Sequence, residues 1–230
     1  MRELWKKHER WLLGGGTVLL FFLAWEAASK AKLVNPLFLS SPSQILKEGY
    51  ALFSQGELTE HIKVSSFEFL LGYSLSALIG IPLGMAAGWY KRLNYMLSPF
   101  LSALYSTPMV ALLPLIILWV GIGIWSKVLI IFLGAFFPIM INTMSGVQMI
   151  DHKLLEAAHS FGADDRRLFK TIIFPSSVPF IVTGLRLGVA RGLVSIIVGE
   201  LYAANAGIGY FIILAGTSFQ TTKVFVGVLL

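Results

Sequence analysis

The sequence of 230 residues contains no cysteine, few charged residues and only four histidines. The absence of cysteine excludes disulfides and any thiol-based metal or redox site. Aspartate, glutamate, lysine and arginine together make up 13% of the residues, whereas soluble domains carry about 25%. So few charges cannot cover a water-facing surface, and the composition therefore argues against a soluble globular protein.

Charged residues are missing altogether from four long stretches. None occurs in residues 69–90, 93–126, 128–150 or 201–222. A helix needs about 20 apolar residues to cross a hydrocarbon core about 30 Å thick, and each stretch is long enough. A soluble helix of this length would carry a polar face, and these stretches have none. We therefore predict an all-α, polytopic membrane bundle of about six transmembrane helices.

The spans can be placed along the chain. Five complete spans are expected near residues 11–29, 66–90, 96–120, 126–148 and 178–199. A sixth begins near Val224, but the apolar residues from there to Leu230 are too few to cross a bilayer. We expect a short N-terminal segment, residues 1–10, followed by a single transmembrane domain, residues 11–230, whose last helix is truncated at residue 230.

Lysine and arginine are distributed unequally between the two sets of loops. If the N-terminus is cytoplasmic, ten of them lie inside and six outside, which favours this orientation. The net charge of +6 then reflects topology, and no nucleic acid partner is needed to explain it. The polar loop 151–176 lies in the cytoplasm. Segment 35–62 lies outside, where Ser40–Ser43 indicates a helix cap before a short amphipathic helix.

Glycine and proline are placed as in packed membrane helices. Glycines recur every fourth residue in two spans, at positions 80, 84 and 88 and again at 184, 188 and 192. Each stripe stays on one helix face and lets a neighbouring backbone approach, so ordinary helix packing is the favoured interpretation. Pro99, Pro108 and Pro114 are expected to kink the third span or to mark its end.

A few polar side chains interrupt the spans, and charges inside a membrane are candidates for function. Arg186 and Arg191 lie in the fifth predicted span, Glu200 at its outer end and Asn142 in the fourth. Each could contact a transported solute. Each could equally be structural, the arginines by pairing with a buried acid or a helix carbonyl, Glu200 as a solvated helix end, and Asn142 by an interhelical hydrogen bond. The arginines point about 140° apart, so they cannot both face one narrow pore.

Motifs typical of nucleotide hydrolysis and of nucleophilic catalysis are absent from the sequence. The sequence has no phosphate-binding loop of the form GxxxxGK[ST] and no nucleophile elbow of the form GxSxG. His152 and His159 would lie about 10 Å apart along a helix, too far to share one metal ion. We therefore expect no catalytic residue, no metal site and no cofactor in this chain.

The loop 151–176 has the pattern of two short helices separated by a glycine. Asp151 can cap the first helix, and Gly162 is placed to end it. Leu154, Ala158 and Phe161 are expected to share one face of this helix. Asp164 or Asp165 can start the second helix, and Pro175 is expected to mark a break before the next span. Such a rigid projection suits docking into a partner, although a plain interfacial loop fits equally well.

Within this loop stand Glu156-Ala157-Ala158, then Gly162, Ile172 and Phe174-Pro175. The segment resembles the cytoplasmic loop of permease subunits in binding-protein-dependent ABC importers, whose pattern is EAA, three residues, G, nine residues and I-x-L-P. The spacing agrees throughout, and Phe174 stands where the pattern has leucine. Shorter motifs, among them residues 39–43, 118–123, 136–138, 184–186 and 199–200, resemble the branch that imports nitrate, sulfonates and taurine.

The resemblance implies a protein of the bacterial inner membrane with several partners. A second permease subunit, expected to be identical, would complete the pathway, a cytoplasmic ABC ATPase dimer would bind ATP and magnesium, and an external solute-binding protein would deliver the substrate. The helix from Leu154 to Phe161 would couple to the ATPase. Sulfonates, taurine, nitrate and neutral vitamin-type solutes all stay open as substrates. The alternative is a secondary transporter or channel that works without ATP; it would favour midplane acids or an inverted repeat, and neither is apparent.

Overall fold

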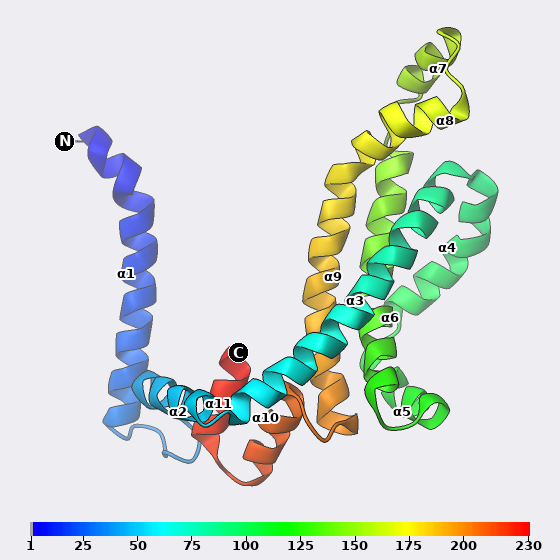
Figure 1. Cartoon of the computed structure of the whole chain (residues 1–230). Helices are drawn as coiled ribbons and strands as arrows, with labels where there is room; N and C mark the ends of the chain where they lie inside the picture. Colours follow the sequence, from blue (N-terminus) through cyan, green and yellow to red (C-terminus); the bar gives the residue numbers. More distant parts are fainter. Residues whose placement is uncertain (1) are drawn as a thin grey trace. The chain divides into compact units, whose positions relative to one another are not determined.

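The computed structural model describes residues 2–230, with side chains described from Leu13 onward. This part of the chain contains helices and loops and no strand, so the all-α prediction is confirmed (Figure 1). The chain divides into two compact units. We call the described residues up to Ile62 together with Ile208–Leu230 the terminal unit, and Lys63–Gly207 the central unit. The side chains of the expected N-terminal segment, residues 1–10, lie outside the described residues.

The terminal unit is built from short helices around a small apolar core. It contains α1 (Arg2–Lys30), α2 (Pro42–Ser54), the start of α3 (Glu57–Trp89), α10 (Ile208–Thr217) and α11 (Thr221–Leu229). The buried core consists of Ile45, Leu52, Leu58, Phe211 and Val226. On α2 the side chains of Ile45 and Leu52 point into this core, while Leu46, Tyr50 and Phe53 are exposed.

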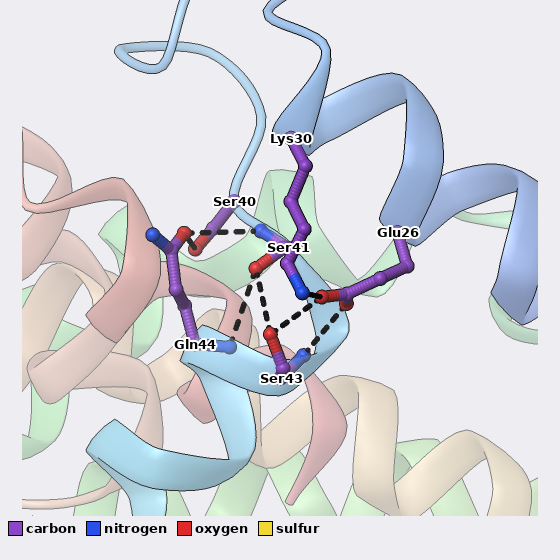
Figure 2. A network of polar contacts seen from close by, with 6 residues as sticks. All are labelled: Glu26, Lys30, Ser40, Ser41, Ser43 and Gln44. Atoms are coloured by element: carbon purple, nitrogen blue, oxygen red, sulfur yellow. Dashed lines mark hydrogen bonds and ion pairs between the residues drawn. The ribbon is translucent and has the colours of Figure 1, made fainter.

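A polar network fixes the start of α2 against the end of α1 (Figure 2). Ser41 caps α2, its hydroxyl accepting a hydrogen bond from the Gln44 amide at 3.3 Å. The amide and hydroxyl of Ser43 both donate to the Glu26 carboxylate, at 3.0 and 2.6 Å. Lys30 forms an ion pair with the same carboxylate at 2.8 Å. The serine cluster therefore acts as a helix cap, as the sequence predicts.

The central unit is organised around one deeply buried helix. It contains most of α3, then α4 (Lys91–Ser106), α5 (Met109–Val120), α6 (Ile124–Gln148), α7 (His152–Ser160), α8 (Asp165–Leu168), a π-helical turn η1 (Phe169–Ile173) and α9 (Phe174–Ala203). Helix α6 is buried along most of its length, with α3 and α9 packed against it (Figure 1). An apolar helix enclosed in this way can carry its hydrophobic residues on every face.

The two predicted glycine stripes are the contacts that bring these helices together. A Cβ atom on Gly84 of α3 would lie 2.6 Å from the Met140 carbonyl oxygen of α6, and one on Gly88 would lie 2.5 Å from the Val147 Cβ. On α9, a Cβ at Gly188 would lie 2.9 Å from the Ile139 side chain. Both stripes therefore serve ordinary close packing of helix backbones.

Three helical segments of the described residues are long and apolar enough to cross a membrane. They are α3, α6 and the continuous helix from Asp165 to Ala203. Helices α4 and α5 qualify only as a pair, and they are bent by 100°. The expected third span, 96–120, therefore falls on two helices, and Pro108 lies at the kink that its prolines predict. Thr107 adopts an extended conformation before Pro108, as the proline ring requires, and the helix ends there. The expected first span, 11–29, falls within α1, but its first side chains lie outside the described residues.

The chain does not break before the fifth span, although Pro175 predicts that it should. The helix runs without interruption from Asp165 to Ala203. Its π-helical turn, Phe169–Ile173, lies immediately before the proline, and the Phe174 amide donates to the Phe169 carbonyl. A proline lacks an amide hydrogen and clashes with the carbonyl four residues earlier. The wider π turn changes the hydrogen-bond register at this point, so the proline is accommodated without a break.

Candidate functional site

The loop between α6 and α9 contains a short helix, α7 (His152–Ser160), that is capped at both ends. The Asp151 side chain accepts a hydrogen bond from the Lys153 amide at 2.9 Å. At the other end the Gly162 amide donates to the His159 carbonyl at 2.8 Å, and the Ala163 amide donates to the Ala158 carbonyl at 3.0 Å. This is the Schellman pattern, and Gly162 adopts the positive φ of +79° that it requires. The predicted start and end of the helix are confirmed.

A second short helix holds α7 against the membrane helices. The Asp164 side chain caps α8 by accepting from the Arg167 amide at 3.0 Å, as predicted. Leu168 of α8 and Ile173 of η1 are fully buried, in one cluster with Val147 of α6. Because α8 continues directly into α9, a push on α7 can pass through packed side chains into the long helix.

Helix α7 has an inward face and an outward face. Leu155 and Ala158 pack against the buried cluster of Leu168 and Ile173. Leu154 is 55% exposed and Phe161 92% exposed. Ala158 lies within about 60° of Leu154 and Phe161 around the helix, as predicted, but it is half-buried while the other two are exposed.

The central residues of the motif lie on the exposed side of α7. Glu156 and Ala157 are exposed, together with Leu154 and Phe161. Glu156 also lines a cavity of about 630 Å³, which α7 shares with the junction of α3 and α4. Polar and charged groups in its wall come from Lys91, Asn94, Gln148, His152 and His159. Among the described residues, no group of three or more histidine, aspartate or glutamate side chains could hold a metal ion.

The four predicted pathway residues lie in different surroundings. Asn142 donates from Nδ2 to the Pro138 carbonyl at 2.8 Å and lies against Gly184 of α9. Glu200 is 1% exposed and accepts a hydrogen bond from the Ser65 hydroxyl at 2.5 Å. Gly207, at φ +125°, leaves room for the Glu200 carboxylate, which a Cβ atom there would overlap. Asn142 therefore makes this hydrogen bond within α6 and not between helices. Glu200 joins α9 to α3, so the interpretation of Glu200 as a solvated helix end is wrong.

The two arginines of α9 are both exposed in the single chain, and they differ in their relation to the cavity at the break between α4 and α5. Arg191 lines a cavity of about 420 Å³ at the break between α4 and α5, together with residues of α6 and α9. Its other polar lining comes from Tyr105, Ser106, Thr107 and Ser195. Arg186 is exposed on the same helix and does not line this cavity.

Comparison with known proteins adds the family. Residues 80–230 match the family described as the binding-protein-dependent transport system inner membrane component. The chain belongs to this family. It is accordingly a transport subunit rather than an enzyme, a multi-pass inner-membrane permease of an ABC importer.

Several relatives of this permease carry a substrate in their names. SsuC of Bacillus subtilis, named for aliphatic sulfonates transport, is 34% identical over 98% of this chain and 82% of its own length. The taurine transport permease TauC of Escherichia coli is 31% identical over 97% of this chain and 83% of its own. ThiX of Halalkalibacterium halodurans, a formylaminopyrimidine transport permease, is 34% identical over 90% of this chain and 82% of its own.

Sequence reasoning missed one buried ion pair of the permease. Lys127 of α6 and Glu68 of α3 lie 2.5 Å apart, with side chains 6% and 1% exposed. With a cytoplasmic N-terminus, Lys127 is one of the six basic residues predicted to lie outside, and it separates two charge-free stretches. That isolation was the available signal, since one charge between two apolar runs needs a partner if the chain stays in the membrane.

Proposed function

We propose that this permease moves a small anion into the cell by alternating access, driven by a partner ATPase dimer. Two of the relatives above are named for sulfonate and taurine transport, which supports a sulfonate-like anion. The relative named for a formylaminopyrimidine favours a neutral heterocycle as the second candidate. Nitrate belongs to the same anion class, and no cofactor is assigned to this chain.

Helix α7 is the observation on which the mechanism rests. It is capped at both ends, anchored by Leu155 on its inner face and exposed at Leu154 and Phe161 on its outer face. A stiff helix transmits a push that a flexible loop would absorb. We assign it the role of coupling helix: Leu154 and Phe161 enter a groove of the ATPase, and Glu156 pairs with a basic residue there.

The remaining parts of the proposal concern assembly and orientation. Two copies of this chain form the pathway, and an external solute-binding protein delivers the substrate. The N-terminus and the loop that carries α7 face the cytoplasm, where the ATPase subunits bind ATP and magnesium. The distribution of lysine and arginine supports this orientation.

Coupling can be tested by removing the outward apolar anchor. Phe161→Ser takes away a phenyl ring that is 92% exposed in the single chain, and Phe38→Ser makes the same change at an exposed position in the expected outer segment. We expect Phe161→Ser to reduce ATPase co-purification and ATP-dependent uptake in proteoliposomes about tenfold or more, because buried aromatic anchors dominate interfaces. Phe38→Ser should leave ATPase co-purification unchanged.

Two further variants separate the coupling role from general damage. Replacing Glu156 by Ala and Gly162 by Val should weaken ATPase association while leaving the permease in the membrane fraction. Uptake of solute by the permease alone, in vesicles that lack ATP and ATPase, would contradict the importer mechanism. So would full ATPase stimulation in the Phe161→Ser complex.

A further inference from the structure

The cavity at the break between α4 and α5 has apolar residues and one charged residue in its wall. It is enclosed by the end of α4, the start of α5, and parts of α6 and α9, and its volume is about 420 Å³. Its apolar lining includes Leu133, Phe137 and Val194. Arg191, from within the long continuous helix α9, is the one charged residue among those that line the cavity. A charge placed there is costly unless something compensates it.

Arg191 has no internal counter-ion in the described part of the chain. The ion pairs found there join Glu26 with Lys30, Glu68 with Lys127, and Glu57 with Lys223. The guanidinium group is therefore not paired with a carboxylate of its own chain among those residues. The structural role that a buried acid would give Arg191 has no support there, and the cavity is left with a net positive wall.

The broken helix adds partial positive charge to the same cavity. Pro108, Met109 and Val110, at the N-terminus of the 12-residue helix α5, all line it. No side chain caps this end of the helix. The first amide groups of a helix and its dipole favour an anion. In transporters, the N-termini of broken helices are suited to anionic groups of a substrate for the same reason.

A third observation is independent of the helix end. Ser195 lines the cavity from α9 and is only 7% exposed. Its hydroxyl makes no hydrogen bond to any other group in the part of the chain that the structure describes. A hydroxyl at a cavity wall that has no acceptor in the protein can donate to a ligand oxygen in that cavity.

We propose that this cavity is the subsite that receives the oxyanion group of the transported solute. The Arg191 guanidinium, the first amides of α5 and the Ser195 hydroxyl donate to its oxygens. A sulfonate or another multi-oxygen anion fits this set, because a guanidinium presents a planar fork of donors to paired oxygens. A neutral heterocycle carries no negative charge that could pair with the Arg191 guanidinium. This inference rests on the proposed importer function and selects the anion class within it.

The chain's lack of cysteine provides a direct test in the assembled complex. Ser106→Cys places a single thiol of this chain at the cavity wall. Its modification rate is measured by intact mass with two reagents of opposite charge, sulfonatoethyl and trimethylammonioethyl methanethiosulfonate. Rates are taken without nucleotide and after trapping with ATP and vanadate, and each is divided by the rate for a free thiol.

We expect the anionic reagent to be preferred, and Arg191→Gln to lower the anion-to-cation rate ratio about tenfold or more, since a nearby unscreened charge acts oppositely on the two reagents. Arg191→Lys should keep most of the preference. Arg186→Gln, the matched control on the same helix, should change the ratio less than about twofold, because screened distant charges act weakly. In the protein that retains Arg191, excess taurine should lower the rate at which each reagent modifies the Ser106→Cys thiol.

The outcomes separate this inference from the proposed function. An unchanged ratio in Arg191→Gln overturns the subsite, and so does a thiol that reacts in neither nucleotide state. If Arg191→Gln retains ATP-driven taurine uptake with an unchanged KM, the importer function is supported and only the subsite is contradicted. Absence of ATP-driven uptake of both solute classes by the unmodified complex would instead refute the proposed function, whatever the thiol rates.

Discussion

The ion pair of Glu68 and Lys127 is the most enclosed pair of charges in the described part of the central unit. Both side chains are almost fully buried, and their charged atoms lie 2.5 Å apart. Removing two charges from water is expensive, and their mutual attraction offsets this only while both are present. The pair connects α3 to the first turn of α6, close to the Ser65–Glu200 hydrogen bond that connects α3 to α9.

A double-mutant cycle on this pair should show strong coupling. Glu68→Gln or Lys127→Met alone leaves one buried charge without a partner and should destabilise the permease by about 3–5 kcal/mol. The double variant should be less destabilised than either single one. The measurement is SDS-induced unfolding of the purified permease, followed by circular dichroism. Lys63→Met, an exposed lysine on α3, is the control and should change stability by less than about 0.5 kcal/mol. Additive effects of the two substitutions would show that the charges do not depend on each other.

The structural role of some residues could be predicted from the sequence, and that of others could not. Asp151, Asp164 and Gly162 act through their own backbone neighbours, so their cap and turn functions follow from local spacing. Lys127 meets its partner from a helix distant in the chain, and no local pattern fixes that pairing. The same reason explains why nothing in the sequence placed Arg191, rather than Arg186, at a cavity.

At the scale of elements, the central unit depends on how closely α3 and α9 approach α6. Gly84 and Gly88 of α3 leave no space for a side chain, because α6 backbone or β-carbon atoms occupy it. A glycine costs about 1 kcal/mol in helix propensity relative to alanine. Here that cost is offset by contact between two helix backbones, which the small-residue stripe permits.

Alanine at two glycines should therefore have opposite effects. Gly84→Ala forces α3 away from the Met140 carbonyl and should destabilise the permease by about 1–3 kcal/mol through overpacking. Gly216→Ala in α10 meets its nearest atom, on Val224, at 4.0 Å, which is ordinary contact. It should be neutral or stabilise by up to about 1 kcal/mol. Thermal unfolding of both variants in the same detergent checks this, and equal destabilisation would mean that the α3–α6 contact is not tight in the membrane.

The elements also show where periodicity stops being informative. Hydrophobic runs predicted α6 and α9 well, since each is one uninterrupted apolar helix. Residues 93–126, which cover most of α4 and all of α5, also lack charge, yet the chain bends there by 100°. Three prolines occur in it, and only Pro108 coincides with the break. At Pro175 a π-helical turn accommodates the missing hydrogen bond, and the helix continues. A proline in the sequence shows that one helix hydrogen bond will be missing. Whether the helix then bends or changes its hydrogen-bond register depends on the neighbouring elements.

For the whole molecule, the proposed coupling role of α7 requires a particular orientation in the membrane. Helix α9 has 30 residues and is therefore about 45 Å long, enough to cross a bilayer with its headgroups. It begins next to the α7 loop and ends at Ala203, so these two ends belong on opposite sides of the membrane. The excess of lysine and arginine in the segments on the α7 side favours the proposed orientation, in which that side is cytoplasmic.

Single cysteines in the cysteine-free chain should report this orientation. Ser160→Cys in α7 and Asn205→Cys beyond α9 are both exposed in the structure. In right-side-out vesicles, a membrane-impermeant maleimide should label position 205 and spare position 160, and inverted vesicles should give the reverse. Labelling of position 160 from outside would place the coupling helix where no ATPase can reach it, and the importer mechanism would then fail together with the topology. The complex with the ATPase adds a second check: if the ATPase binds α7 as proposed, it should protect position 160 and leave position 205 reactive.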